Sequence, residues 1–248
     1  MDQFGYAKLK IKRANKHIDD FKSVADGVEK AKRSCTDESI EHGAVRITHE
    51  IVDAEGMLFE MALIMGDALH NLKSALDYAW TGAMSRVPGV ATNHSKFPVS
   101  DTREGLAAMV NSTQIESLSP SLYSLIMDHL QPYQSSDTFI WEIHRLNIID
   151  KHKLLVPTYM RVGVSDMKLR NKITGREVCG DSWQTRYDAP LHFDFFIEEE
   201  IKNKGHLSAS ILFDEGVPIE NREIRGTLDD FLAVVCNTVE LLESVPTP

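Results

Sequence analysis

Two segments of the sequence place ionisable side chains among apolar residues. They are GDALHNLKSALDYAW at 66–80 and WEIHRLNIIDKHK at 141–153. The apolar residues of both segments recur at helical spacing, so we expect two helices. Ionisable groups are costly to bury unless they are paired. The two segments therefore indicate either a buried structural network or an active site.

The first segment predicts one polar stripe along a helix. Its polar side chains are three, four and seven residues apart, which places them on one face. The stripe consists of Asp67, His70, Asn71, Ser74, Asp77 and Tyr78. Apolar residues occupy the other faces. We therefore expect a helix that is buried on most of its circumference, with its polar edge against another polar edge or a ligand.

The second segment supplies a matching edge, because Asn147 and Asp150 fall where core residues are expected. Buried polar side chains are nearly always hydrogen-bonded. We expect His70 or Asn71 to supply the partners, so that the two helices pack against each other. The residues predicted to bind a ligand in the resulting cleft are Asp67, His70, Asn71, Asn147 and Lys151.

The same segments hold the groups needed for acid–base chemistry on a phosphodiester. His152 or His70 could act as general base, and Arg145 or Lys151 could act as a fixed cation. Asp150 could orient the base. The alternative is a hydrogen-bonded network that holds the helices in register and catalyses nothing, since most buried polar groups serve structure.

A metal site is the other alternative for these residues. Asp67 and His70, with His144, Asp150 or His152, could supply nitrogen and oxygen ligands. No HExxH motif or paired-cysteine spacing accompanies them, and no glycine-rich phosphate loop occurs. We therefore predict neither a metal nor a cofactor.

Composition limits the partners. The 248 residues carry a net charge of −10, which argues against a global electrostatic grip on nucleic acid but permits a local one. A nuclease should show a basic rim around His152, for which the candidates are Lys151, Lys153, Arg161 and Lys168. The three scattered cysteines cannot all pair, which indicates reduced thiols and a cytoplasmic location. The longest apolar run contains Glu60 and is too short to cross a membrane.

The order of predicted elements is typical of an α+β fold with an antiparallel sheet. Helices are expected at 6–33, 56–84, 103–110, 120–130, 137–153 and from 227, and strands at 43–52, 156–164, 176–179, 191–198 and 206–213. We expect Ser119, Asp137 or Ser136, and Thr227 to cap three of the helices. One domain is predicted for 1–248, mainly helical to residue 153, with strands and a final helix in 154–248.

Three segments together resemble a set of uncharacterised bacterial proteins. They are GDALHNLKSALDYAW, the QPY at 131–133 and RLNIIDKHKLL. In that set an HNLRSALDHL-like helix precedes a QPY turn and an N-x-DKHR-like helix. This chain departs from the pattern at Lys73, Tyr78 and Lys153, and has one extra residue between Asn147 and Asp150. The resemblance implies no activity.

The spacing Arg145-x6-His152 is similar to the Arg-x(4–6)-His motif of HEPN ribonucleases. That resemblance implies RNA cleavage without metal, at a homodimer interface, with His152 as base and Arg145 stabilising the phosphorane charge. The chain departs from it at Leu146, where a polar residue is common, and in its strand-rich second half. Two functions are therefore expected: a metal-independent ribonuclease, or a non-catalytic protein that binds a small or nucleotide-like ligand.

Overall fold

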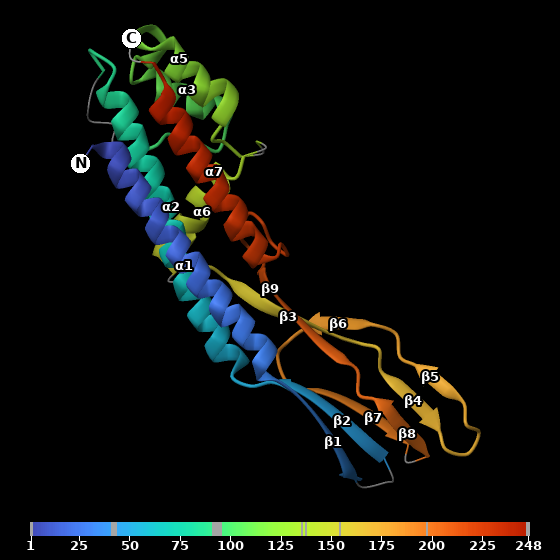
Figure 1. The fold of residues 1–248 in the computed structure, drawn as a ribbon. Helices are drawn as coiled ribbons and strands as arrows, with labels where there is room; N and C mark the ends of the chain where they lie inside the picture. The colour runs from blue at the N-terminus through green and yellow to red at the C-terminus, as the bar shows by residue number, and fades with distance from the viewer. Residues whose placement is uncertain are drawn as a thin grey trace.

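The computed structural model describes residues 2–40, 44–90, 96–134, 136, 138–153, 155–196 and 198–246. The molecule is elongated, with the helices at one end and most of the strands at the other (Figure 1). The α+β class predicted from the sequence is confirmed. None of the helices in the described ranges is long and apolar enough to span a membrane.

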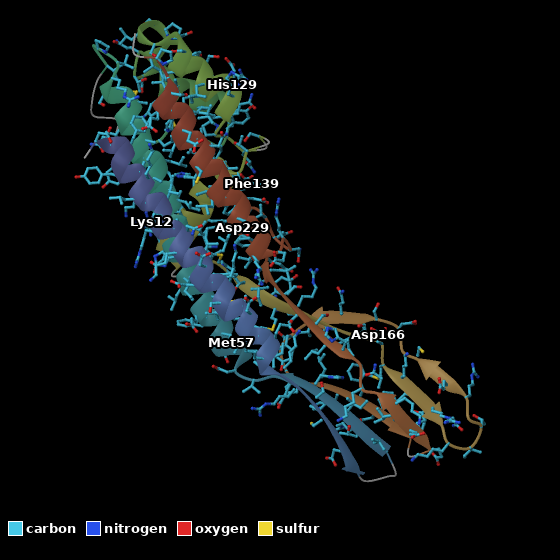
Figure 2. The ribbon with its side chains drawn as sticks, in the orientation of Figure 1. Lys12, Met57, His129, Phe139, Asp166 and Asp229 are labelled. Carbon is cyan, nitrogen blue, oxygen red and sulfur yellow. The ribbon has the colours of Figure 1, made fainter. Side chains whose placement is uncertain are left out.

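Three long helices run along the molecule: α1 (Gln3–Ala31), α2 (Ala54–Ser85) and α7 (Ile224–Ser244). The apolar face of α1 is buried because its apolar residues recur at helical spacing. The shorter α6 (Ile140–Lys153) packs on α2 and α7. Phe139, immediately before α6, lies beside α7, with its ring centroid 5.4 Å from that of Phe231 (Figure 2).

Short helices close the far end of the helical part: α3 (Arg103–Asn111), α4 (Ile115–Leu118), α5 (Pro120–Ser124) and the π-helical turn η1 (Leu125–Leu130). The single helix predicted at 120–130 is therefore α5 followed by η1. Ser119 occupies the N-cap position of α5 as predicted, but its hydroxyl makes no capping bond and is buried without a hydrogen-bond partner among the described residues. Asp137 lies outside the described residues, and Ser136 bonds to Thr138.

The strands of the described chain form three small antiparallel sheets. One has the order β1-β2-β7, from β1 (Lys32–Ile40), β2 (Ala44–Ile51) and β7 (Leu191–Phe196). Another has the order β6-β3-β9, from β6 (Trp183–Arg186), β3 (Thr158–Ser165) and β9 (His206–Phe213). The last has the order β5-β4-β8, from β5 (Glu177–Cys179), β4 (Lys168–Asn171) and β8 (Glu199–Asn203).

The ends of two elements are set by local hydrogen bonds. A turn at 172–175 joins β4 to β5, with the Gly175 N–H donating to the Asn171 carbonyl at 2.8 Å and Gly175 at φ 70°. The predicted cap at Thr227 is wrong. Glu223 caps α7 by accepting from the Arg225 and Gly226 N–H groups at 2.9 and 2.7 Å. Thr227 instead donates to the Glu223 carbonyl.

One cluster of buried apolar side chains extends from the helices to the sheet that contains β3 and β9. Trp80 and Phe231 belong to its helical part, and Val162 and Phe213 to the strands. α2 thus has core on most of its circumference, as predicted. Its remaining edge carries the polar side chains described next.

Candidate functional site: the seam between α2 and α6

The two predicted polar edges meet along an antiparallel seam between α2 and α6. At one end Gly66 faces Asp150 so closely that a Cβ on Gly66 would lie 2.8 Å from the Asp150 Cγ. Small residues permit such approaches between helices. The missing side chain of Gly66 therefore makes room for the carboxylate.

One turn along α2, His70 meets Asn147. Burial lowers the pKa of His70, helped by the Lys151 and Lys10 ammonium groups, whereas Asp67 and a hydrogen bond to the Asn147 amide raise it. The net pKa lies below the ordinary value, so the imidazole is neutral at pH 7. The Asn147 Oδ1 atom is buried, and no hydrogen bond of good geometry reaches it from the described residues.

A further turn along α2, Lys73 and Asp77 meet His144. Lys73 is only 6% exposed and forms an ion pair with Asp77, whose Oδ1 also accepts the Phe97 N–H at 2.8 Å. Burial lowers the pKa of Lys73, and Asp77 opposes that shift. Burial, followed by the Lys73 charge, lowers the pKa of His144 to about 4. The middle of the seam thus holds a buried cation beside a neutral histidine.

Several buried polar atoms of α6 lack a hydrogen-bond partner among the described residues. They are Glu142 Oε2, His144 Nδ1 and Asn147 Oδ1. Burial also raises the pKa of Glu142. Unsatisfied buried polar atoms are rare in native proteins and often mark functional positions. These atoms leave α6 with hydrogen-bonding capacity that the described protein groups do not use.

Helix α1 adds charge to the Gly66 end of the seam. Lys10 donates to Asn71 Oδ1 at 3.2 Å, and the Asn71 amide donates to the Asp67 carbonyl at 2.8 Å. Burial raises the pKa of Asp150, and the neighbouring Asp67 raises it further, while His70 and Lys151 oppose the shift. We call this group the polar cluster: Lys10, Asp67, His70, Asn71, Asn147, Asp150 and Lys151.

The polar cluster contains every residue predicted to bind a ligand, with Lys10 added. No site role was predicted for Lys10 or Lys73 from the sequence, and His144 was considered only as a metal ligand. The four-residue spacing from Lys73 to Asp77 was the available signal, because it places a cation on the same stripe. Among the described residues, no group of three or more His, Cys, Asp or Glu side chains could hold a metal ion.

Arg145 and His152 lie on a different face of α6 from Asn147 and Asp150. Arg145 is half-buried, with its guanidinium carbon 5.9 Å from the centre of the Trp141 ring, and His152 is exposed. Neither side chain has a hydrogen bond or an ion pair to a described residue. Asp150 faces α2, so the structure does not place it where it could orient His152.

The basic rim expected around His152 comes from α6 itself, where Lys151 and Lys153 are both exposed. Of the other two candidates, Arg161 lies on β3 and donates to the Tyr159 hydroxyl at 2.7 Å, and Lys168 lies on β4. The last turn of α6 therefore carries two lysines and a histidine in succession.

No protein-family model matches the chain, and no curated protein or solved structure shows significant similarity to it.

Proposed function

We propose that this protein cleaves RNA phosphodiesters without a metal ion, with Arg145 and His152 as the catalytic residues. One observation carries the proposal: the half-buried Arg145 guanidinium has no carboxylate partner among the described residues, and it shares a helical face with the exposed His152. An arginine guanidinium with no carboxylate partner among the described residues is suited to bind a phosphate oxygen pair.

The proposed step transfers one proton and exchanges one bond at phosphorus. His152 accepts the proton of the ribose 2′-hydroxyl, and the 2′-oxygen bonds to phosphorus. The bond from phosphorus to the 5′-oxygen breaks, and that oxygen takes a proton from water. Arg145 stabilises the charge on the phosphoryl oxygens. The two Cα atoms are two helical turns, about 10 Å, apart, a gap that two long side chains can bridge around one phosphate.

The test is a cleavage assay on single-stranded RNAs and tRNA, with and without EDTA. We expect cleavage that EDTA does not change, because no metal takes part. His152→Ala and Arg145→Ala should each lower the rate by about 100-fold or more, typical of losing a general base or a charge-stabilising donor. His206→Ala and Arg176→Ala are matched controls, since both residues are exposed and lie on strands or turns away from α6.

Circular dichroism of each variant checks that the fold is retained. Absence of cleavage by wild type at high enzyme concentration contradicts the proposal, as does cleavage that survives both substitutions. Sedimentation of the same samples tests the homodimer that the HEPN resemblance implies.

A second candidate function is binding of a nucleotide-like ligand at the polar cluster. The observation favouring it is that Lys10 and Lys151 both act on the neutral His70 imidazole, so two cations surround a group that can hydrogen-bond. Equilibrium binding of a fluorescent nucleotide separates the two functions. In this alternative Lys10→Ala and Lys151→Ala each weaken binding, Arg145→Ala and His152→Ala do not, and RNA stays intact.

A further inference from the structure

A hollow on the outer face of the β6-β3-β9 sheet holds an arginine that forms no ion pair with any described residue. Its volume is about 410 Å³, and Tyr159, Arg161, Gln184, Arg186 and Asn221 are among its lining residues. A second hollow of about 260 Å³ shares Arg161, Gln184 and Asn221. We propose that these joined hollows bind a small molecule through its oxyanion, a carboxylate or a phosphate, with Arg161 as the main ligand.

Strand register brings two arginines together in this hollow. Arg161 on β3 is the direct partner of Arg186 on β6. Like charges placed opposite each other on neighbouring strands are destabilising. Both guanidinium carbons lie near the same Tyr159 ring, at 5.8 Å for Arg161 and 4.9 Å for Arg186. The pair therefore needs negative charge nearby.

That negative charge reaches only one of the two arginines. Arg186 donates to both carboxylate oxygens of Asp214, at 2.8 and 2.6 Å, and lies 3.6 Å from an oxygen of Asp188. Arg161 donates to the Tyr159 hydroxyl, a neutral group, and forms no ion pair with a described residue. The charge of Arg186 is thus matched within the fold, whereas the charge of Arg161 is not.

The contacts around Arg161 hold its guanidinium in place. The Tyr159 hydroxyl accepts from Arg161 and donates to Asn221 Oδ1 at 2.8 Å. Both residues line the hollow, so the bonds that fix the guanidinium leave its other N–H groups available there. A preorganised guanidinium loses less entropy when it binds a carboxylate or phosphate.

The body of the ligand would lie in the second hollow, which Gly163, Gln184 and Ser208 line. A Cβ on Gly163 would lie 2.9 Å from Ser208 Oγ and 3.1 Å from Gln184 Cγ. A side chain at this position would therefore displace Ser208 and Gln184, both of which line the second hollow. Their hydroxyl and amide groups suit a polar molecule, and the first hollow, at about 410 Å³, has the size of a small-ligand pocket.

Three carboxylates line the two hollows, and one of them, Asp214, is paired with Arg186. Glu223 lines the second hollow, but its carboxylate is engaged in capping α7. Glu215 lines the first hollow, and its carboxylate makes no ion pair with a described residue. Glu215 should therefore weaken the binding of an anion. Removing its charge should strengthen binding, whereas removing the charge of Arg161 should weaken it.

The experiment is a titration of the purified protein with inorganic phosphate and, separately, with succinate. Calorimetry gives the affinity, and the NMR signal of the Arg161 Nε–H reports the site. We expect saturable millimolar binding of at least one probe. Preference for phosphate or for succinate identifies which oxyanion the site takes. Arg161→Gln should weaken binding at least tenfold, Arg161→Lys less, and Glu215→Gln should strengthen it severalfold.

Arg176→Gln is the matched control, since Arg176 is exposed on the turn between β4 and β5 and should not change the affinity. Thermal melts of all variants check folding. The proposal is overturned if neither probe binds saturably to wild type, or if binding survives Arg161→Gln unchanged. Its outcome is separate from that of RNA cleavage, because His152→Ala should leave this binding intact.

Discussion

Gly66 of α2 and Asp150 of α6 pack so closely that no side chain fits between them: a Cβ on Gly66 would lie 2.8 Å from the Asp150 Cγ. This contact fixes the register of the whole seam. From it, His70 falls opposite Asn147, and the Lys73–Asp77 pair falls beside His144. The polar side chains of the seam are therefore positioned by packing at a glycine.

Gly66→Ala should destabilise the protein by about 1–3 kcal/mol, because the methyl group must displace the Asp150 carboxylate or push the helices apart. Gly27→Ala is the matched control. A Cβ at Gly27 in α1 meets nothing within 4 Å, so that variant should gain about 0.5–1 kcal/mol from helix propensity. Urea denaturation measures both. Equal stability changes in the two variants would contradict the close contact.

Asp150→Asn should be neutral or slightly stabilising at pH 7, by less than about 1 kcal/mol, since Asp150 is partly exposed and solvent screens its charge. Burial and Asp67 raise its pKa, so the carboxylate is less favourable in the folded state. This cost disappears when Asp150 is protonated, which is complete below the ordinary Asp pKa. The difference in stability between wild type and Asp150→Asn should therefore shrink as the pH falls. Denaturation at pH 7 and at pH 3.5 measures the difference in stability between wild type and Asp150→Asn. If Asp150→Asn is less stable than wild type at pH 7, hydrogen-bond donors in the fold depend on the Asp150 charge.

His144 should make the protein less stable as the pH falls. Its folded pKa of about 4 lies below its ordinary value of 6.5, so the unfolded chain binds the proton first. The stability is fully present above pH 6.5 and is lost as the pH falls toward 4, by at most about 3 kcal/mol. His144→Gln should flatten this slope. NMR titration of the imidazole measures the pKa directly, and a value above 6 would refute the buried environment.

The buried Lys73–Asp77 ion pair should also contribute to the stability of the seam. Lys73→Met should cost about 1–3 kcal/mol, because it leaves Asp77 with only the Phe97 N–H as a described partner. Asp77→Asn should also destabilise, since it leaves the buried ammonium unpaired. The double variant should lose less than the sum of the two, and a double-mutant cycle measures the difference. Strict additivity would mean that the two charges do not interact.

The periodicity of the sequence was sufficient to predict the seam. Asn147 and Asp150 interrupt an apolar helical face, and His70 lies on the only polar stripe of α2, so their meeting follows from pattern alone. Lys73 escaped prediction because lysine usually lies on the solvent side of a helix. Its burial depends on the tertiary position of Asp77, and helical spacing does not give that position.

The strand predictions were best supported where one face is buried, as in β2 and β9, although β5 was also predicted and its three residues are all exposed. The alternation in β9 has a buried side, and its bounds were predicted correctly. The strands β1, β4, β6 and β8 were missed because they are short or polar and show little alternation. The hollow at Arg161 depends on register across three strands, which brings Arg186 opposite it. That register cannot be predicted from the local sequence of any one strand.

The most direct measurement is the single-turnover rate of RNA cleavage in EDTA by wild type and by His152→Ala. The substrate is one RNA, compared with a copy that lacks the 2′-hydroxyl at the cleaved nucleotide. Proton abstraction by His152 predicts a 2′,3′-cyclic phosphate product and a loss of about 100-fold or more in the variant. It also predicts no cleavage of the deoxy copy. Equal rates for wild type and variant, or cleavage of the deoxy copy, would contradict the proposed role of His152.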